Sequence, residues 1–339
     1  MIREIAFIAL LICSSCISSE LKEQKSEIQV ISEKIVQNPT DINLLYERVN
    51  YNKSNNYLES ALFDLKEIVK LDSLNAINHF NIADVYFELS KQKNTNSNYP
   101  YLVKYHLEKS INIDSKNKDA FALMGELLLA YNKYEEAIRL FDTSLRIEYN
   151  QEKVHMLMGY AFKELKQTDN AINCFRNSVN INPDFFEAYM QLGHIFHLLK
   201  DTMAIRYYKN ALKLKPSDEM ALYNKALFFQ TILEWNRALE SYAELHKVNP
   251  FHSSGHYNLG FIHMELGLYD VAANNFSDAI YSDSKFYEAY YSRGNCFETL
   301  GNIAQAESDY KRAIDLNPQY FYAIEALESL RKNNRKFNK

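Results

Sequence analysis

A fixed spacing of small residues is the feature that most constrains the fold of this chain. Glycine recurs at intervals of 34 residues in two runs, and one alanine stands between the runs: Gly125, Gly159, Gly193, Ala226, Gly260 and Gly294. A period of roughly 20 to 50 residues indicates repeated supersecondary units that stack on one another. Each unit must bury its apolar face against its neighbours, because one unit alone is too small to hold a core.

Three other residue types keep the same period. A proline lies ten residues before Gly193, Ala226, Gly260 and Glu328. An alanine lies twelve residues after Gly125, Gly159, Gly260 and Gly294, and an aromatic follows four residues beyond each of these alanines. The prolines are Pro183, Pro216, Pro250 and Pro318, the alanines Ala137, Ala171, Ala272 and Ala306, and the aromatics Phe141, Phe175, Phe276 and Tyr310. Because proline stops a helix, we expect each unit to end near its proline.

Outside these marks the chain is poor in turn-forming residues. It has 8 glycines and 6 prolines in 339 residues, whereas the two together average roughly 12% of protein sequences. The scarcity argues against a sandwich or barrel, which needs many turns, and excludes collagen-like or Pro/Gly-rich disordered chains. With 47% hydrophobic and 24% charged residues, the chain is able to bury a large core. We therefore predict an all-helical protein.

The order of glycine, alanine, aromatic and proline within 34 residues resembles the tetratricopeptide repeat (TPR), a unit of two antiparallel helices. The resemblance implies an all-α solenoid, a right-handed superhelix of helix pairs. The small residue at position 8 and the alanine at position 20 let the two helices approach each other. We expect the aromatic at position 24 to fill the space between units and the proline at position 32 to end the second helix.

The landmarks divide residues 42–320 into about eight TPR units. The second unit carries eight extra residues near Lys91 to Asn98, and the fifth is one residue short. The predicted units are 42–75, 76–117, 118–151, 152–185, 186–218, 219–252, 253–286 and 287–320. Residues 16–41 are expected to form a tether and a leading helix over 22–38. Residues 321–339 are expected to form a capping helix over 321–333 and a basic tail.

The first twenty residues predict export and a lipid anchor. Arg3 precedes the apolar stretch Ile5 to Ile12, which is too short to span a bilayer but fits a secretory signal core. Ser14 and Ser15 before Cys16 resemble the lipobox of bacterial lipoproteins. Residues 1–15 are therefore a predicted lipoprotein signal peptide, with Cys16 lipidated and the protein held at a bacterial envelope membrane, most plausibly the outer one. An ordinary signal peptide, or an N-terminal helix of a cytosolic protein, is the alternative.

Composition argues against nucleic acid as a partner. The formal net charge is -5, and no basic stripe runs through the body of the chain to neutralise phosphates. Arg331 to Lys339 hold five cations, which we expect to form a frayed tail, with a patch for an anionic surface as the alternative. Cys174 and Cys296 are expected to be small core residues, too far apart for a disulfide.

No catalytic, cofactor or metal site is predicted. Nearly every residue from 42 to 330 belongs to a repeat, and the chain has no Gly-rich phosphate loop, CxxC pair or HExxH motif. His194 and His197 lie three residues apart on one helix, but no third ligand lies nearby in sequence. We therefore predict neither an enzyme nor a small-molecule substrate.

The TPR resemblance implies that positions 2, 5, 9 and 12 of each first helix line a concave groove. Those positions carry Met156, Tyr160, Met190, His194, Tyr223, Leu227, Tyr257, Phe261, Met264 and Tyr291. Exposed apolar surface usually marks an interaction site, and methionine and tyrosine suit protein contacts. The alternative is that the superhelix closes and these side chains pack on one another. The family's carboxylate clamp needs lysine and asparagine where the third unit has Ala122 and Glu126, so that activity is not supported.

The sequence thus predicts a membrane-anchored TPR scaffold or adaptor that binds protein or peptide partners through this groove. It resembles envelope TPR lipoproteins that act as adaptors. The alternative function is a soluble cytosolic TPR scaffold or regulator without a lipid anchor.

Overall fold

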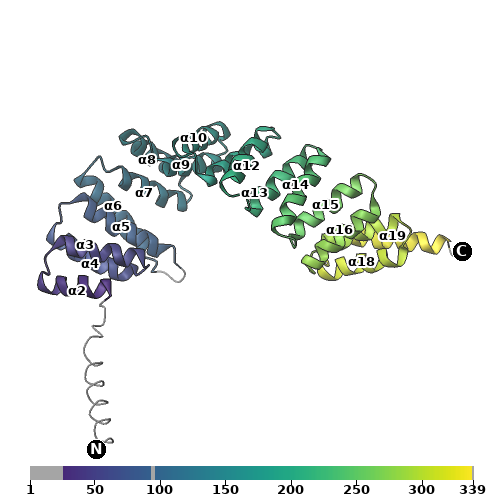
Figure 1. Cartoon of the computed structure of the whole chain (residues 1–339), viewed down its shortest axis with the longest axis horizontal. Helices are drawn as coiled ribbons and strands as arrows, with labels where there is room; N and C mark the ends of the chain where they lie inside the picture. The colour runs from purple at the N-terminus through teal and green to yellow at the C-terminus, as the bar shows by residue number, and fades with distance from the viewer. Residues whose placement is uncertain (1–25, 93–95, 338–339) are drawn as a thin grey trace, which may run out of the picture. The chain divides into compact units, whose positions relative to one another are not determined.

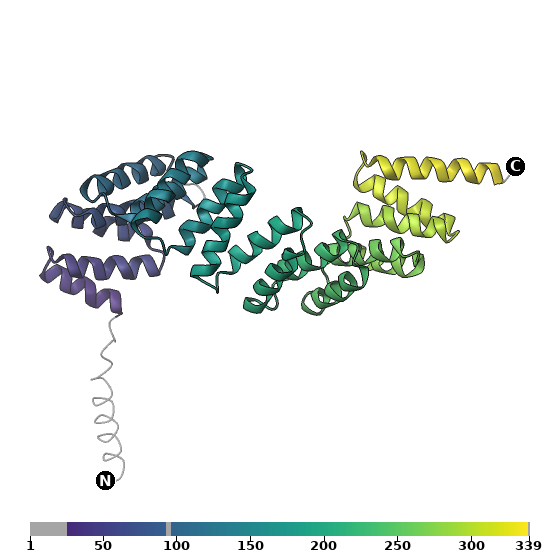
Figure 2. The same cartoon turned by 90° about the horizontal axis from the view of Figure 1, so that it is seen from above.

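The computed structural model describes residues 26–92 and 96–337, and every regular element in these residues is an α-helix. Within each compact unit of the chain, each helix packs against the next one, and the helices form antiparallel pairs (Figures 1 and 2). The predicted all-α class built from TPR-like helix pairs is confirmed. The predicted signal peptide and Cys16 lie outside the described residues.

The chain divides into two compact units, a division that the repeat pattern did not indicate. Unit 1 ends at Tyr149 and unit 2 begins at Asn150. Unit 1 contains α2 (Glu27–Gln37), α3 (Ile42–Ser54), α4 (Leu58–Leu71), α5 (Ala76–Ser90), α6 (Tyr99–Ile113), α7 (Lys118–Ala130) and α8 (Tyr134–Ile147). Unit 2 contains α9 (Glu152–Glu164), α10 (Thr168–Ile181), α11 (Phe186–Leu198), α12 (Met203–Leu214), α13 (Glu219–Thr231), α14 (Trp235–Val248), α15 (Ser253–Glu265), α16 (Tyr269–Ser282), α17 (Tyr287–Thr299), α18 (Ile303–Leu316) and α19 (Phe321–Phe337).

In five of the helix pairs that the structure describes, an aromatic ring of the second helix meets a glycine of the first. A Cβ atom on Gly159 would lie 2.8 Å from a ring carbon of Phe175, and one on Gly193 would lie 2.5 Å from a ring carbon of Tyr208. Both rings are fully buried. The expectation that this aromatic fills the space between units stays a prediction. The absence of a Cβ atom leaves room for the ring between the two helices of one pair.

Proline and left-handed residues mark the two kinds of helix end. Each of the four periodic prolines lies two residues after a second helix; α10, for example, ends at Ile181, ahead of Pro183. The turn between the helices of a pair holds a residue with positive φ. These residues are Asn56, Asn132, Lys166, Lys200, Leu233, Gly267 and Gly301. The left-handed residue lets the chain leave the first helix and reverse direction.

The C-terminal helix is longer than the sequence predicted. Helix α19 reaches Phe337, beyond the predicted end at residue 333, so the basic stretch from Arg331 continues the helix up to that point. Cations near a helix C-terminus interact favourably with its dipole. The division of 42–320 into eight units stays a prediction. Cys174 and Cys296 are free and buried, as expected.

Candidate partner-binding face

The predicted groove residues all lie in unit 2, on the first helix of each pair. Successive first helices approach one another, α11 with α13, α13 with α15, and α15 with α17. We call the surface formed by α9, α11, α13, α15 and α17, continued by α19, the first-helix face. It is the place where side chains from different pairs lie next to one another.

The ten predicted residues are neither fully buried nor freely exposed as a group. Met190 is 8% exposed and belongs to the core, whereas the imidazole of His194 is exposed. The other eight are half-buried: Met156, Tyr160, Tyr223, Leu227, Tyr257, Phe261, Met264 and Tyr291. Each of these side chains therefore keeps part of its surface open to solvent.

Aromatic contacts fix the inner ends of these side chains. The ring of Tyr160 lies edge-on to Phe175 with centroids 5.5 Å apart. The ring of Tyr223 lies 5.1 Å from His252 and 6.2 Å from Tyr242. Such contacts hold the rings in defined orientations. The alternative, in which these side chains pack on one another, thus applies to the inner ends of these rings. Their outer ends stay open to solvent.

Hydrogen bonds join every neighbouring pair of first helices in unit 2. Lys163 donates to Gln191 Oε1 at 3.0 Å between α9 and α11, and His197 Nε2 lies 3.2 Å from Thr231 Oγ1 between α11 and α13. The other two bonds are Asn258 Nδ2 to Tyr223 Oη, 3.2 Å, and Tyr257 Oη with Ser292 Oγ, 3.4 Å. Burial raises the pKa of Tyr257, so its hydroxyl stays protonated near neutral pH. We call these four contacts the cross-helix bonds.

A group of tyrosines continues the face at its C-terminal end. We call Tyr287, Tyr291, Tyr320 and Tyr322 the tyrosine cluster. The pattern missed Tyr320 and Tyr322, because the first lies between helices and the second lies in the predicted capping helix. The available signal was that Tyr322 occupies position 2 of a ninth first helix.

One exposed residue of α13 was also missed. Met220 is 67% exposed and occupies position 2, on the same helix as the predicted Tyr223 and Leu227. The position rule itself could have found it.

Neither histidine of α11 belongs to a group of three His, Cys, Asp or Glu side chains suited to a metal ion in the described part of the chain. His197 lies within reach of Thr231 and, at 3.4 Å, of the Tyr208 hydroxyl. Burial and the charge of Lys163 lower the pKa of His194.

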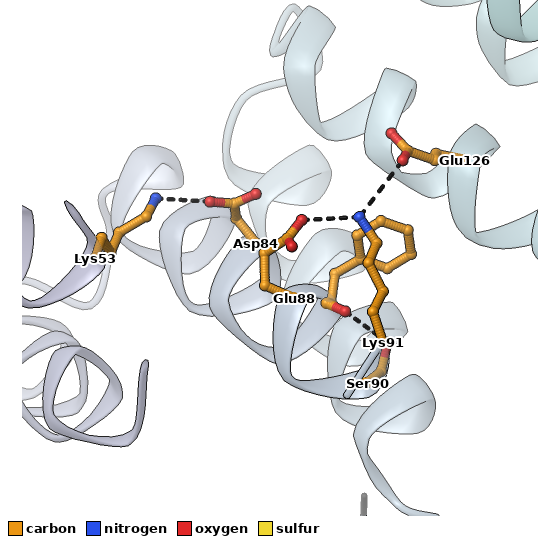
Figure 3. Close-up of polar contacts among 7 residues, drawn as sticks. Lys53, Asp84, Glu88, Ser90, Lys91 and Glu126 are labelled. Carbon is orange, nitrogen blue, oxygen red and sulfur yellow. Dashed lines mark hydrogen bonds and ion pairs between the residues drawn. The ribbon is translucent and has the colours of Figure 1, made fainter. Parts of the chain in front are cut away.

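The first helices of unit 1 carry charged side chains that are paired with one another (Figure 3). Lys53 of α3 lies 2.7 Å from Asp84 of α5. Lys91 lies 2.8 Å from Glu88 and 3.7 Å from Glu126 of α7, and its ammonium stands 4.1 Å from the ring centroid of Phe87. This surface is polar and charge-paired, unlike the aromatic surface of unit 2.

Unit 1 also has open clefts. One, of 420 Å³, lies among α6, α7 and α8, and Met124, Leu127 and Tyr131 form part of its lining. Another, of 850 Å³, lies between α2 and α3 and includes Ile31 and Tyr51. None of the predicted groove residues lines either cleft.

Family models match three stretches of unit 2. A tetratricopeptide repeat model matches residues 287–320, a TPR repeat model matches 159–200, and a second tetratricopeptide repeat model matches 186–218. These three stretches are therefore similar to tetratricopeptide repeats.

Solved structures with similar helix arrangements are distant in sequence. MamA (residues 41 to the end) from Desulfovibrio magneticus RS-1 is 20% identical, with a TM-score of 0.46, over 50% of this chain and 96% of that chain. The APC/C hetero-tetramer Cut9–Hcn1 is 15% identical, with a TM-score of 0.46, over 86% and 56% respectively. YrrB, described as a TPR protein with an unusual peptide-binding site, is 17% identical, with a TM-score of 0.39, over 66% and 97%. A comparison with curated proteins gives no match.

Within residues 26–92 and 96–337, no helix combines the length and apolar character needed to cross a bilayer.

Proposed function

We propose that the first-helix face of unit 2 binds a segment of a partner protein, and that the chain works as an adaptor tethered to a bacterial envelope membrane. The observation that carries the binding proposal is the row of half-buried methionine and aromatic side chains on α9 to α17. A stable stack of helix pairs needs only the inner ends of these side chains. Their outer ends supply apolar contact area to a ligand.

The arrangement lowers the entropic cost of binding. Rings such as Tyr223 and Tyr257 are already held by neighbouring rings and by cross-helix bonds. A ligand therefore has few rotamers to immobilise when it contacts them. Methionines such as Met156 and Met264 adapt their shape to the ligand.

The binding proposal is tested by site-specific photo-crosslinking in cells. A crosslinking amino acid at Phe261 or Met220 is expected to capture the partner, whereas one at Tyr281 is the control. Tyr281 is 80% exposed but lies on the second helix α16, away from this face. Equal capture from Tyr281, or none from Phe261 and Met220, would contradict the proposal.

A paired substitution separates binding from folding. We expect Met220→Ser with Phe261→Ser to abolish partner capture, because both residues contribute apolar contact area but neither donates a hydrogen bond. Helical circular dichroism and the melting temperature are expected to stay close to those of a Tyr281→Ser control. Replacing Tyr223 and Tyr257 is less informative, because their hydroxyls hold neighbouring helices together.

The anchor proposal rests on the serines before Cys16 and the short apolar stretch ahead of them. Labelled palmitate is expected to enter the full-length protein and to be lost in Cys16→Ser. An unlabelled protein that fractionates with the cytosol in both forms would instead favour the cytosolic scaffold. That outcome leaves the binding proposal standing, because the two rest on different residues.

A further inference from the structure

The tyrosine cluster is built around one ring. The ring centroid of Tyr320 lies 4.8 Å from that of Tyr287, 5.4 Å from that of Tyr291 and 5.7 Å from that of Tyr322. All three contacts are edge-on, so the rings support one another at steep angles. Tyr322 is 59% exposed, and the other three are half-buried. Rigid aromatic surface is therefore presented to solvent by α17, α19 and the turn between α18 and α19.

Carboxylates accompany the cluster at positions of the same face. Glu288 occupies position 2 and Glu298 position 12 of α17, and Glu325 occupies position 5 of α19. Burial raises the pKa of Tyr320, and the neighbouring tyrosines and Glu288 raise it further. Glu288 directly follows Tyr287 of the cluster in α17. Glu298 Oε2 accepts a hydrogen bond from the Tyr310 hydroxyl at 2.6 Å.

Two basic side chains of α17 and α19 are paired with carboxylates outside the cluster, and Lys332 at position 12 of α19 is exposed. Arg293 of α17 donates two hydrogen bonds to Asp309, each 2.8 Å long. Arg331 of α19 lies 3.1 Å from Glu307. Among the side chains that the structure describes, no lysine or arginine nitrogen lies at ion-pair distance from Glu288, Glu298 or Glu325.

We propose that this end of the first-helix face takes a cationic segment, rich in arginine or lysine, of the partner protein. The inference rests on the proposed binding function and names the chemistry of its ligand. The guanidinium and ammonium groups lie over the ring faces of Tyr291, Tyr320 and Tyr322, and the carboxylates at the rim neutralise them.

Charge favours a cationic segment over an acidic or purely apolar one. An aromatic face carries negative potential and attracts a cation by about 0.5 to 1 kcal/mol at an exposed site. Glu288 next to Tyr287, with Glu298 and Glu325 at other positions of the same face, repels an acidic peptide and leaves an apolar one with unneutralised neighbours. The α9 end of the same face differs, because Lys163 already stands 5.1 Å from the ring centroid of Tyr160.

Fluorescence anisotropy on the purified full chain tests the proposal. The probe is a short labelled peptide of alternating arginine and serine, compared with one of alternating glutamate and serine. We expect the arginine peptide to bind and the glutamate peptide not to bind. Raising the salt from about 50 to about 500 mM is expected to weaken binding strongly, because salt screens exposed charges.

Two variants locate the site. Tyr322→Ser, and separately Glu288→Gln with Glu325→Gln, are each expected to weaken binding of the arginine peptide roughly tenfold, a loss of about 1.4 kcal/mol. The matched controls are Tyr281→Ser and Glu240→Gln, which change exposed residues on the second helices α16 and α14. They are expected to leave the affinity unchanged. Circular dichroism confirms that each variant is folded.

Equal binding of the two peptides, or equal loss in the variants and their controls, would overturn the cationic proposal. The broader binding function has a separate readout. If crosslinking from Phe261 captures a partner while the arginine peptide does not bind at the tyrosine cluster, the face binds protein and the cationic chemistry is wrong. If neither occurs, the proposed function fails as well.

Discussion

Individual residues show where the fold is sensitive to conditions, and the contact between His246 and His256 is the clearest case. Their rings stack with centroids 3.9 Å apart where α14 meets α15. His246 Nε2 and His256 Nδ1 are buried and have no hydrogen-bond partner. Nearby, His252 Nδ1 accepts a hydrogen bond from the backbone of Gly255 at 3.0 Å. Protonating both imidazoles would place two positive charges close together where little water can solvate them.

We predict that acid destabilises the protein through this contact. Burial and the neighbouring His256 lower the pKa of His246 to about 4, from an ordinary value of 6.5. The native state therefore keeps the neutral ring. Its stabilisation is complete above pH 6.5 and is lost as the pH falls from 6.5 towards 4.

Thermal melts between pH 7 and pH 4 measure this loss. His106 behaves similarly, because burial and His79 lower its pKa to about 4 as well. His246→Gln with His106→Gln is expected to flatten the pH dependence of the melting temperature over this range. An unchanged slope in the double variant would show that carboxylates elsewhere cause the acid sensitivity.

At the scale of the helix pair, the turn between the two helices carries backbone strain. Leu233 has φ of 61° and Lys200 has φ of 55°, whereas Gly267 and Gly301 occupy the equivalent turns without a Cβ atom. A left-handed conformation costs a residue with a Cβ atom roughly 1 to 2 kcal/mol. The side chain of Leu233 is 66% exposed and recovers little by packing.

We therefore predict that Leu233→Gly stabilises the protein by about 1 kcal/mol, since it removes the strain and creates no cavity. Urea denaturation measures the change. The matched control is Leu199→Gly, a comparably exposed leucine one position before the left-handed Lys200. The control is expected to destabilise, because its backbone gains nothing from the absence of a Cβ atom.

An arginine–aspartate pair recurs in the first and last helix pairs. Arg48 and Asp64 join α3 to α4 with bonds of 2.8 and 2.7 Å, and Arg293 and Asp309 join α17 to α18 in the same register. The side chain of Asp309 is only 8% exposed. Removing one partner of such a pair leaves the other charge buried and unpaired.

Asp309→Ala is accordingly expected to lower the free energy of unfolding by about 3 kcal/mol. The double variant Arg293→Met with Asp309→Leu is expected to be less destabilised than the single one, because neither charge remains. Chemical denaturation of the three proteins decides this. A single variant as stable as the wild type would mean that water solvates Arg293 well.

The helices were predictable because glycine and proline recur at a fixed period, glycine at helix crossings and proline just after helix ends. Pro183 and Gly159 mark a helix end and a helix crossing whatever lies around them. Contacts between side chains at different positions of the repeat were less predictable. The contacts of Tyr320, the stacking of His246 and the length of α19 all depend on side chains of neighbouring helices. A glycine or proline at a fixed position in the repeat does not predict which side chains these are.

At the scale of the whole molecule, the two units are built alike but present different surfaces. The first helices of unit 1 carry charges paired with one another, as Lys53 with Asp84, whereas those of unit 2 carry methionine and aromatic residues. The repeat pattern predicted the aromatic row but not the division at Tyr149 and Asn150, because the period continues across it.

We predict that residues 150–339 fold alone and keep the binding activity. Unit 2 has its own buried clusters, among them one around Phe175 and Tyr208 and another around Tyr310 and Leu330. The fragment is expected to be helical and to melt cooperatively, because each helix pair of a repeat stack is stabilised by its contacts with neighbouring pairs. Circular dichroism and crosslinking from Phe261 test it. A fragment that is unfolded, or folded without capture, would contradict the prediction.

The cross-helix bonds of unit 2 have an elastic consequence. They join neighbouring pairs at their first helices, by contacts such as Tyr223 with Asn258 and Tyr257 with Ser292. Between second helices, Arg176 of α10 also donates a hydrogen bond to the Tyr207 hydroxyl of α12 at 3.3 Å. Each cross-helix bond limits how far the two first helices that it joins can separate. An extended ligand on the first-helix face would therefore meet contact points whose spacing is restrained by bonds within the protein itself.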